Sequence, residues 1–285
     1  MNTSSIARIV ALADFPTQLK GCVVAIGNFD GVHRGHQAVL DVALKEAAAA
    51  GVPAVVLTFE PHPRTVFKPD NPVFRLTPAP LKAELVGHMG FAAVVELPFT
   101  REFAQQSAET FVRQVLIDCF AINRVITGFN FHFGRDRQGS PEFLRSAGAR
   151  LGFAVSVVEP FEDEGSELLS SSRIRTCIRE GDIAQANGLL GYHYAVQGRV
   201  LEGKKLGRTL GFPTANMALP PETGLRTGIY ATRFRCADGS IHDGVASFGH
   251  RPTVDESGTA LLETCLLYTS DAADEDCRVG GGGGG

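Results

Sequence analysis

The chain has 285 residues, of which 44% are hydrophobic and 20% charged, and its formal net charge is −4. These values describe an ordinary soluble globular protein long enough for two domains, and they give no indication of a nucleic-acid partner. No apolar run approaches eighteen residues, and residues 1–20 lack the features of a secretory leader, so we expect no membrane segment and a cytoplasmic location. The six cysteines are scattered without a CxxC pair, so we expect reduced thiols.

The first part of the chain alternates apolar runs with helical segments. Residues 23–26 predict a strand, residues 37–50 an alanine-rich helix, and residues 54–59 a second buried strand. The pattern repeats, with helices expected at 80–89, 101–120 and 141–151 and strands at 92–97, 124–127 and 154–158. Continuous apolar strands between helices indicate an α/β domain with a doubly wound, Rossmann-like parallel sheet, which binds ligands at the carboxyl ends of its strands.

The pattern changes after a helical segment at 173–190. Short glycine-rich strands follow at 194–201, 229–236 and 244–248, with turn signals and no amphipathic helix between them. We therefore expect an α/β domain over residues 1–187 and a smaller antiparallel β-barrel domain over residues 188–264.

The turn between the first strand and the first helix has the composition of a phosphate-binding loop. Its glycines let the backbone approach a ligand, and the following helix presents free N–H groups and the positive end of its dipole. His33 and His36, in a His-x-Gly-His pattern, project beside this anion site. A tight turn with exposed histidines is the alternative. The other candidate binding residues of the turn are Gly27, Asn28, Phe29, Asp30, Gly31 and Gly35.

A second segment has the features of a phosphate clamp. Ser170, Ser171 and Ser172 open a helix, so their hydroxyls cap it or meet a phosphate. Arg175 in the same segment can hold an anion through two hydrogen bonds. Such a run by itself is usually a helix cap, but its pairing with the histidine turn favours a phosphate site.

These two segments resemble the paired signatures of the nucleotidyltransferase superfamily, whose second signature usually has Thr where this chain has Ser172. Residues 58–64 and 128–134 narrow the resemblance to the bacterial bifunctional riboflavin kinase/FAD synthetases. The resemblance covers residues 22–264, and it implies transfer of the adenylyl group of ATP to FMN, which gives FAD and pyrophosphate.

The family resemblance also implies roles for individual residues. His33 and His36 would bind the ATP phosphates and stabilise charge on the α-phosphorus. The nucleotide phosphates would be held by Asn130, Ser171, Ser172 and Arg175. The flavin would be bordered by Phe59, Pro61, His62, Pro63 and Arg64. With Mg²⁺ as the counter-ion, catalysis would rest on aligning two anions and neutralising the charge of the transition state.

The β-domain carries another glycine-rich segment, which also contains basic residues. Glycine-rich backbone suits phosphate, and the oxygens of Thr214 and Asn216 suit Mg²⁺, although a solvated loop is the alternative. The whole string resembles the riboflavin kinase signature. This implies that Thr214 and Asn216 hold Mg²⁺ and ATP phosphates, and that Glu263 takes the proton from the riboflavin 5′-hydroxyl. The remaining candidate binding residues are Gly203, Lys204, Gly207, Gly211, Phe212 and Pro213.

The last residues fit neither domain. Residues 265–285 show neither the alternation of a strand nor the periodicity of a helix, and they end in six glycines. Residues 265–275 resemble one reading frame of a transposase sequencing adapter, and a run of guanines encodes glycine. We therefore expect a non-native tail, with a flexible glycine-rich linker as the alternative.

This tail bears on the expected kinase activity. The family's kinase module continues past the position of Glu263 with a further strand and a helix, so we expect an incomplete barrel and weak or no riboflavin phosphorylation.

Two other functions fit part of the pattern. One is a nucleotidyltransferase acting on another phosphate acceptor, and the riboflavin kinase signature counts against it. The other is a non-catalytic flavin-binding module, and the intact His33, His36 and Arg175 count against that. In each case the expected partners are small molecules, chiefly ATP, riboflavin and FMN, and the sequence does not reveal the oligomeric state.

Overall fold

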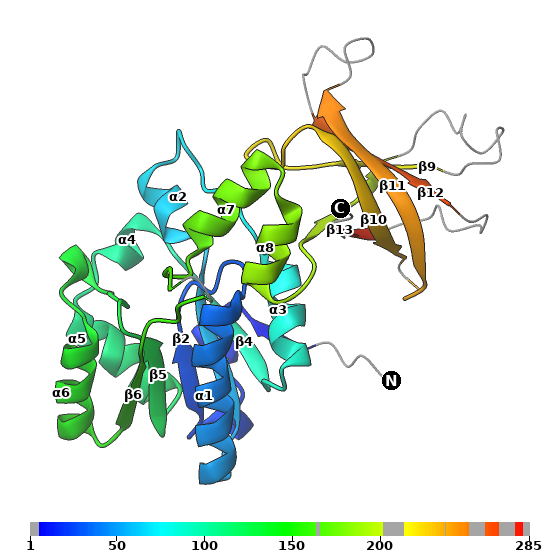
Figure 1. The fold of residues 1–285 in the computed structure, drawn as a ribbon. Coiled ribbons are helices and arrows are strands. Elements are labelled where there is room, and N and C mark those ends of the chain that lie inside the picture. Colours follow the sequence, from blue (N-terminus) through cyan, green and yellow to red (C-terminus); the bar gives the residue numbers. More distant parts are fainter. Residues whose placement is uncertain are drawn as a thin grey trace. The chain divides into compact units, whose positions relative to one another are not determined.

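Figure 1 shows the fold in a computed structural model, which describes residues 6–163, 166–201, 214–236, 238–250, 260–267 and 277–281. The chain forms two compact units. The first runs through Leu169 apart from Phe74–Thr77, and the second holds Phe74–Thr77 and the chain from Ser170 onward. The contacts thus group the helical segment after Ser170 with the second unit, while the domain boundary expected near residue 187 stays a prediction.

The first unit is built on a six-stranded parallel sheet, as the apolar runs predicted. Its strands lie in the order β1-β4-β3-β2-β5-β6, and every neighbouring pair is parallel. The order reverses between β2 and β5, and doubly wound sheets bind ligands at the carboxyl ends of the strands beside such a reversal. The strands are β1 Ala7–Ile9, β2 Val23–Ile26, β3 Ala54–Glu60, β4 Ala93–Pro98, β5 Arg124–Gly128 and β6 Ala154–Val158.

Helices cover both faces of this sheet (Figure 1). Side chains of β2 alternate between two cores, with Val23 and Ala25 in one and Val24 and Ile26 in the other. The core around Val23 also takes residues from α1 (Arg34–Ala50) and α3 (Ala79–His88). The opposite core takes residues from α6 (Pro141–Leu151) and the helical stretch Val112–Cys119. The doubly wound arrangement is therefore confirmed.

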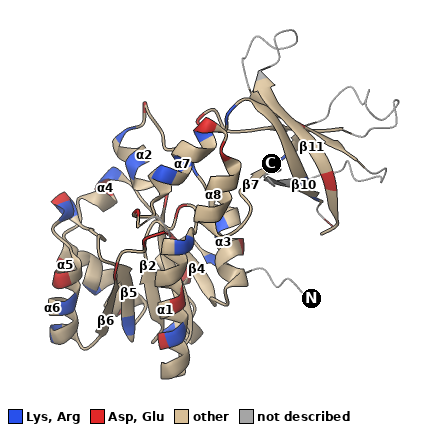
Figure 2. Ribbon diagram, viewed as in Figure 1, with Lys and Arg blue, Asp and Glu red and all other residues tan. Residues whose placement is uncertain are grey.

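Charged residues lie mainly on the helices of the first unit rather than on its strands. Lysines, arginines and acidic residues are interspersed along the helices, while the strands of the first unit carry few of them (Figure 2). Among the described residues, no helix is long and apolar enough to cross a membrane.

Two expected helices are interrupted. Segment 101–120 forms α4 (Arg101–Ala104), α5 (Ala108–Phe111) and the π-helical stretch Val112–Cys119. Ser107 starts α5 anew, since its hydroxyl accepts a hydrogen bond from the backbone N–H of Thr110 at 3.0 Å. Segment 173–190 forms α7 (Ser171–Glu180) and α8 (Ile183–Leu190), separated at Gly181, whose φ is +84°. In the first unit, the sequence analysis did not predict β1 or α2 (Pro63–Phe67).

The second unit continues from α7 and α8 into an antiparallel sheet of seven strands, in the order β7-β13-β10-β11-β12-β9-β8. The two edge strands, β7 and β8, are separated in sequence only by Arg199, so the sheet closes on itself as a barrel. Its core includes Met217, Phe234 and Leu262. The strands are β7 Ala195–Gly198, β8 Val200–Leu201, β9 Thr214–Ala218, β10 Gly228–Arg235, β11 Ile241–His250, β12 Ala260–Leu266 and β13 Cys277–Gly281.

The strands correct the expectation that residues 265–285 stand outside the fold. β12 continues to Leu266, which is 2% exposed, and burial alternates through Leu262, Thr264 and Leu266. β13 pairs with both β10 and β7. The sequence analysis missed this strand because its glycines give no apolar alternation and have a low strand propensity. The non-native origin of the segment stays a prediction.

Candidate active site

The loop after β2 is held in a partly left-handed conformation. Phe29, Gly31 and Val32 have φ values of +45°, +93° and +37°. Non-glycine residues rarely adopt such angles unless their surroundings hold them there. Phe29 and Val32 are each 2% exposed and belong to the core beside α1, which supplies that constraint. At Gly27 a Cβ atom would lie 2.9 Å from the Phe29 ring, so only glycine fits without a shift.

The two histidines of the motif meet at the N-terminus of α1. His33 is 4% exposed, and its Nδ1 accepts a hydrogen bond from the backbone N–H of His36 at 3.2 Å. The two rings stack with centroids 3.6 Å apart, and the Phe29 ring meets His36 edge-on at 5.4 Å. Because Nδ1 of His33 accepts, the neutral ring carries its proton on Nε2.

The loop after β5 leaves the same edge of the sheet. β5 pairs with β2 in parallel register, with Thr127 opposite Ile26. Gly27 and Gly128 therefore leave the sheet side by side, at the point where the strand order reverses. Asn130, two residues further on, is exposed.

A third segment follows β3, the other neighbour of β2. Phe59 is 6% exposed within a group of phenylalanine rings, and the Glu60–Pro61 peptide bond is cis. His62 starts α2, since its Nδ1 accepts a hydrogen bond from the backbone N–H of Arg64 at 3.1 Å. Pro63 occupies the first turn, where its missing N–H costs nothing. The segment expected to border the flavin thus begins at the same carboxyl edge.

The serine and arginine residues of the second predicted signature lie in the second unit. Ser170 is the cap of α7, since its hydroxyl accepts a hydrogen bond from the backbone N–H of Arg173 at 3.3 Å. Ser171 and Ser172 follow in the first turn. Arg175 is 7% exposed, and its Nε donates to the carbonyl oxygen of Phe74 at 2.7 Å, which fixes the orientation of the guanidinium group.

The expected kinase residues fall on two neighbouring strands of the barrel. Asn216 of β9 is the register partner of Glu263 of β12, so both lie on the same face of the sheet. Ala215 and Met217 are buried in the barrel core, and the alternation places Thr214 and Asn216 on the face away from it. The glycine-rich segment before β9 lies outside the described residues, and with it Gly203, Lys204, Gly207, Gly211, Phe212 and Pro213.

Comparison with known proteins decides the family. The family model for FAD synthetase matches residues 15–173, and that for riboflavin kinase matches residues 190–280. A bifunctional riboflavin kinase/FMN adenylyltransferase of Pseudomonas fluorescens is 42% identical, over 91% of this chain and 83% of its own length. The chain belongs to this family.

Further members of the bifunctional riboflavin kinase/FMN adenylyltransferase family match over similar lengths. The Haemophilus influenzae relative is 39% identical over 83% of this chain and 77% of its own length. The Listeria monocytogenes relative is 37% identical over 86% of this chain and 77% of its own length. A crystal structure of a macrolide-efflux protein from Streptococcus pneumoniae has a TM-score of 0.81 at 29% identity. This structural match covers 97% of this chain and 90% of that protein, so it includes residues of both units.

The kinase strands offer oxygen ligands that suit Mg²⁺. Thr214, Asn216 and Glu263 provide a hydroxyl, an amide and a carboxylate oxygen on one face of the sheet. Within the described ranges, no group of three His, Cys, Asp or Glu side chains is placed to hold a metal ion. Since Mg²⁺ is usually held by one or two carboxylates plus substrate phosphates, this sparse donor set fits the ion.

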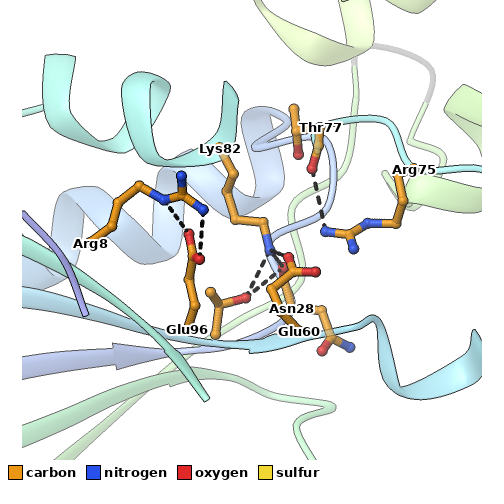
Figure 3. A network of polar contacts seen from close by, with 8 residues as sticks. Arg8, Asn28, Glu60, Arg75, Thr77, Lys82 and Glu96 are labelled. Atoms are coloured by element: carbon orange, nitrogen blue, oxygen red, sulfur yellow. Dashed lines mark hydrogen bonds and ion pairs between the residues drawn. The ribbon is translucent and has the colours of Figure 1, made fainter. Parts of the chain in front are cut away.

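One residue of the first unit was missed by the sequence analysis. Lys82 of α3 is 1% exposed, and its ammonium group lies within hydrogen-bond distance of oxygens from Asn28, Thr58 and Glu60 (Figure 3). A lysine in an expected helix is usually solvated, so no local sequence signal distinguishes this one.

Proposed function

We propose that this family member transfers the adenylyl group of ATP to FMN, and that it also phosphorylates riboflavin. The first activity rests on one observation, the convergence of the loops after β2, β3 and β5 at the carboxyl edge beside the strand-order reversal. Sheets of this class bind ligands at that edge. The relatives carry both activities in their names.

In the proposed adenylyl transfer, a phosphate oxygen of FMN attacks the α-phosphorus of ATP. A new P–O bond forms, the bond to the β-phosphate oxygen breaks, and pyrophosphate leaves. No proton has to be removed, because the attacking phosphate is already ionised. Catalysis therefore depends on holding two anions in line and stabilising the charge that develops at the α-phosphorus.

The histidines are the proposed donors to that charge. Since Nδ1 of His33 accepts from the backbone N–H of His36, the ring proton of neutral His33 is on Nε2, which is the proposed donor. Asn130, Ser171, Ser172 and Arg175 would hold the nucleotide phosphates, and residues 61–64 would border the flavin. Bound Mg²⁺ would supply further charge neutralisation at the phosphates. Losing one preorganised donor of this kind costs about 10²–10³ in rate.

In the proposed kinase reaction, Glu263 takes the proton of the riboflavin 5′-hydroxyl while the γ-phosphoryl group of ATP moves to that oxygen. After Glu263, β13 pairs with β10 and β7. The weak riboflavin phosphorylation expected from the sequence stays a prediction.

A single assay tests both activities. The purified chain is incubated with ATP, Mg²⁺ and either FMN or riboflavin, and the flavins are separated by chromatography. We expect FAD from FMN and little FMN from riboflavin, and we expect His36→Ala to stay folded and lose most FAD synthesis. Unchanged FAD synthesis in His36→Ala refutes the histidine assignment, and normal riboflavin turnover refutes the weak kinase.

The same assay separates the alternative functions. Pyrophosphate release with another phosphate acceptor but not with FMN would identify a different nucleotidyltransferase. Flavin binding without pyrophosphate release would identify a binding module. A cytoplasmic location stays a prediction.

A further inference from the structure

Lys82 is the centre of a buried polar network beneath the loop after β2 (Figure 3). Its Nζ lies 3.0 Å from the carbonyl oxygen of Asn28, 2.9 Å from Oγ1 of Thr58 and 3.2 Å from Oε1 of Glu60. The Thr58 hydroxyl itself donates to the Asn28 carbonyl at 3.1 Å. That carbonyl therefore accepts from two donors, and turning its peptide plane would break both hydrogen bonds.

The acceptors belong to the two segments that the proposed function assigns to the two substrates. Asn28 begins the turn that leads to His33, on the ATP side. Glu60 directly precedes residues 61–64, on the flavin side. Lys82 therefore connects the turn from Asn28 to His33, here called the ATP loop, with residues 61–64, here called the flavin border.

The number of hydrogen-bond acceptors around Lys82 favours a role in holding the two segments over direct binding of a phosphate. An ammonium group has three N–H donors, and at least three oxygens of the protein lie within hydrogen-bond distance of this one. The orientation of the Asn28 carbonyl also fixes the N–H of the next residue, because a planar trans peptide points its N–H opposite to its C=O. The carbonyl of Asn28 is held toward Lys82, so the amide N–H of Phe29 points to the opposite side of the loop.

We propose that Lys82 is a positioning residue that sets the ATP loop and the flavin border relative to each other. This inference rests on the proposed FMN adenylyltransferase function. A buried ammonium group is tolerated only when it is paired and hydrogen-bonded, and removing it takes one hydrogen-bond donor from the Glu60 carboxylate and one from the Asn28 carbonyl. Both substrate segments should then loosen together.

The same sheet offers a matched control. Arg8 of β1 makes a bidentate ion pair with the buried Glu96 of β4, in which Nε lies 3.0 Å from Oε1 and Nη2 lies 2.9 Å from Oε2. This pair joins β1 to β4, and neither residue lies in the loop after β2 or in residues 61–64. Breaking it should lower stability without changing how the substrates are held.

The test compares Lys82→Met with Arg8→Met in the full chain. FAD synthesis gives kcat and KM, calorimetry gives the affinities for ATP and FMN, and thermal melting reports folding. We expect Lys82→Met to lower kcat/KM about 10- to 100-fold and to weaken binding of ATP and FMN together. Arg8→Met should melt earlier and stay within about twofold of the wild-type kcat/KM.

A folded Lys82→Met chain with wild-type kinetics and affinities overturns the inference, and so does an equal kinetic loss in Arg8→Met. If Lys82→Met does not fold, the nearly isosteric Thr58→Val decides. It removes one acceptor of Lys82 and one donor to Asn28, and should cost about three- to tenfold in kcat/KM. No loss in Thr58→Val then refutes the role.

The outcomes keep this inference distinct from the proposed function. A wild-type chain that makes no FAD refutes the adenylyltransferase activity. Calorimetry still tests Lys82 in that case, since coupled loosening predicts weaker ATP and FMN binding in Lys82→Met, and unchanged affinities contradict it.

Discussion

Nδ1 of His33 accepts a hydrogen bond from the backbone N–H of His36, and the two imidazole rings stack with centroids 3.6 Å apart. One side chain therefore caps the helix through Nδ1, while Nε2 carries the ring proton and is the proposed donor to a phosphate. Protonation of Nδ1 would remove the cap, because a protonated nitrogen cannot accept.

Substitution of His33 should separate its role as a helix cap from its proposed role as a catalytic donor. Asparagine can cap the helix but does not place a donor where Nε2 lies, so His33→Asn and His33→Ala should both lose about 10²–10³ in kcat. Only His33→Ala should also lose about 1 kcal/mol of stability. Kinetics and urea unfolding check this, with the α6 cap variant Ser140→Ala as a control that loses stability alone. Full activity in His33→Asn would contradict the donor role.

A methyl group at Gly27 should disturb the site through Phe29. The added Cβ would lie 2.9 Å from the Phe29 ring, which in turn meets the ring of His36. We expect Gly27→Ala to lower kcat about tenfold or more, because small displacements of catalytic groups are costly. Gly188→Ala in α8 is the matched control, since its Cβ meets nothing within 4 Å. It should stabilise the chain by about 0.5–1 kcal/mol and leave FAD synthesis unchanged, as alanine is the better helix former.

The buried thiol of Cys22 predicts a loss of stability in alkali. Burial raises the pKa of Cys22 to about 12, against about 8.5 for an unfolded thiol. Below about pH 8.5 both states keep the proton. Above it the unfolded chain loses its proton first, so stability falls by up to about 1.4 kcal/mol per pH unit. Urea unfolding of wild type and Cys22→Ala should give a constant difference to pH 8 and a shrinking one at pH 9–10. A constant difference through pH 10 would show that the folded thiol ionises.

Glu109 predicts a small acid-sensitive contribution to stability. A hydrogen bond from Arg150 lowers the pKa of Glu109, and charge interactions with Arg150 and Arg113 add to the effect. The contribution is present above the pKa of the unfolded carboxyl and is lost as the pH falls through the lower folded value. Glu109→Gln should therefore lower Tm slightly at pH 7 in low salt, and this difference from wild type should shrink as the solution is made acidic.

Arg150 and Arg113 both contact Glu109, the first from a neighbouring helix and the second from the same helical run. Arg150 reaches Glu109 from α6, whereas Arg113 lies four residues after it in the same helical run. Arg150→Met should therefore lower Tm more than Arg113→Met, measured by melting at low salt. The reverse order would indicate that the contact between α6 and α5 contributes little.

Sequence pattern predicted the centre of the fold well and its interruptions poorly. The buried runs at 23–26 and 54–59 match β2 and β3 to within one residue, because strands covered on both faces are apolar throughout. The helix expected at 101–120 is broken because the Ser107 cap competes with helical periodicity, and periodicity alone does not weigh that competition.

The site shows the same contrast between local and distant signals. The histidine turn is a local motif, and its two rings do meet at a helix N-terminus. Lys82 could not be found in this way, because its partners lie 54, 24 and 22 residues away in sequence. Its role depends on which strands become neighbours, and no local pattern encodes that.

The closure of the barrel also sets an order of assembly during synthesis. Among the described strands of the barrel, β7 is made first and β13 last, and β13 lies between β7 and β10. The parallel sheet of the first unit is complete once Val158 has emerged from the ribosome. Because domains fold as units from the N-terminus, the first unit can bury its core while β7 still waits for its partner. A ribosome halted shortly after β8 would thus hold a folded adenylyltransferase sheet and an unclosed barrel.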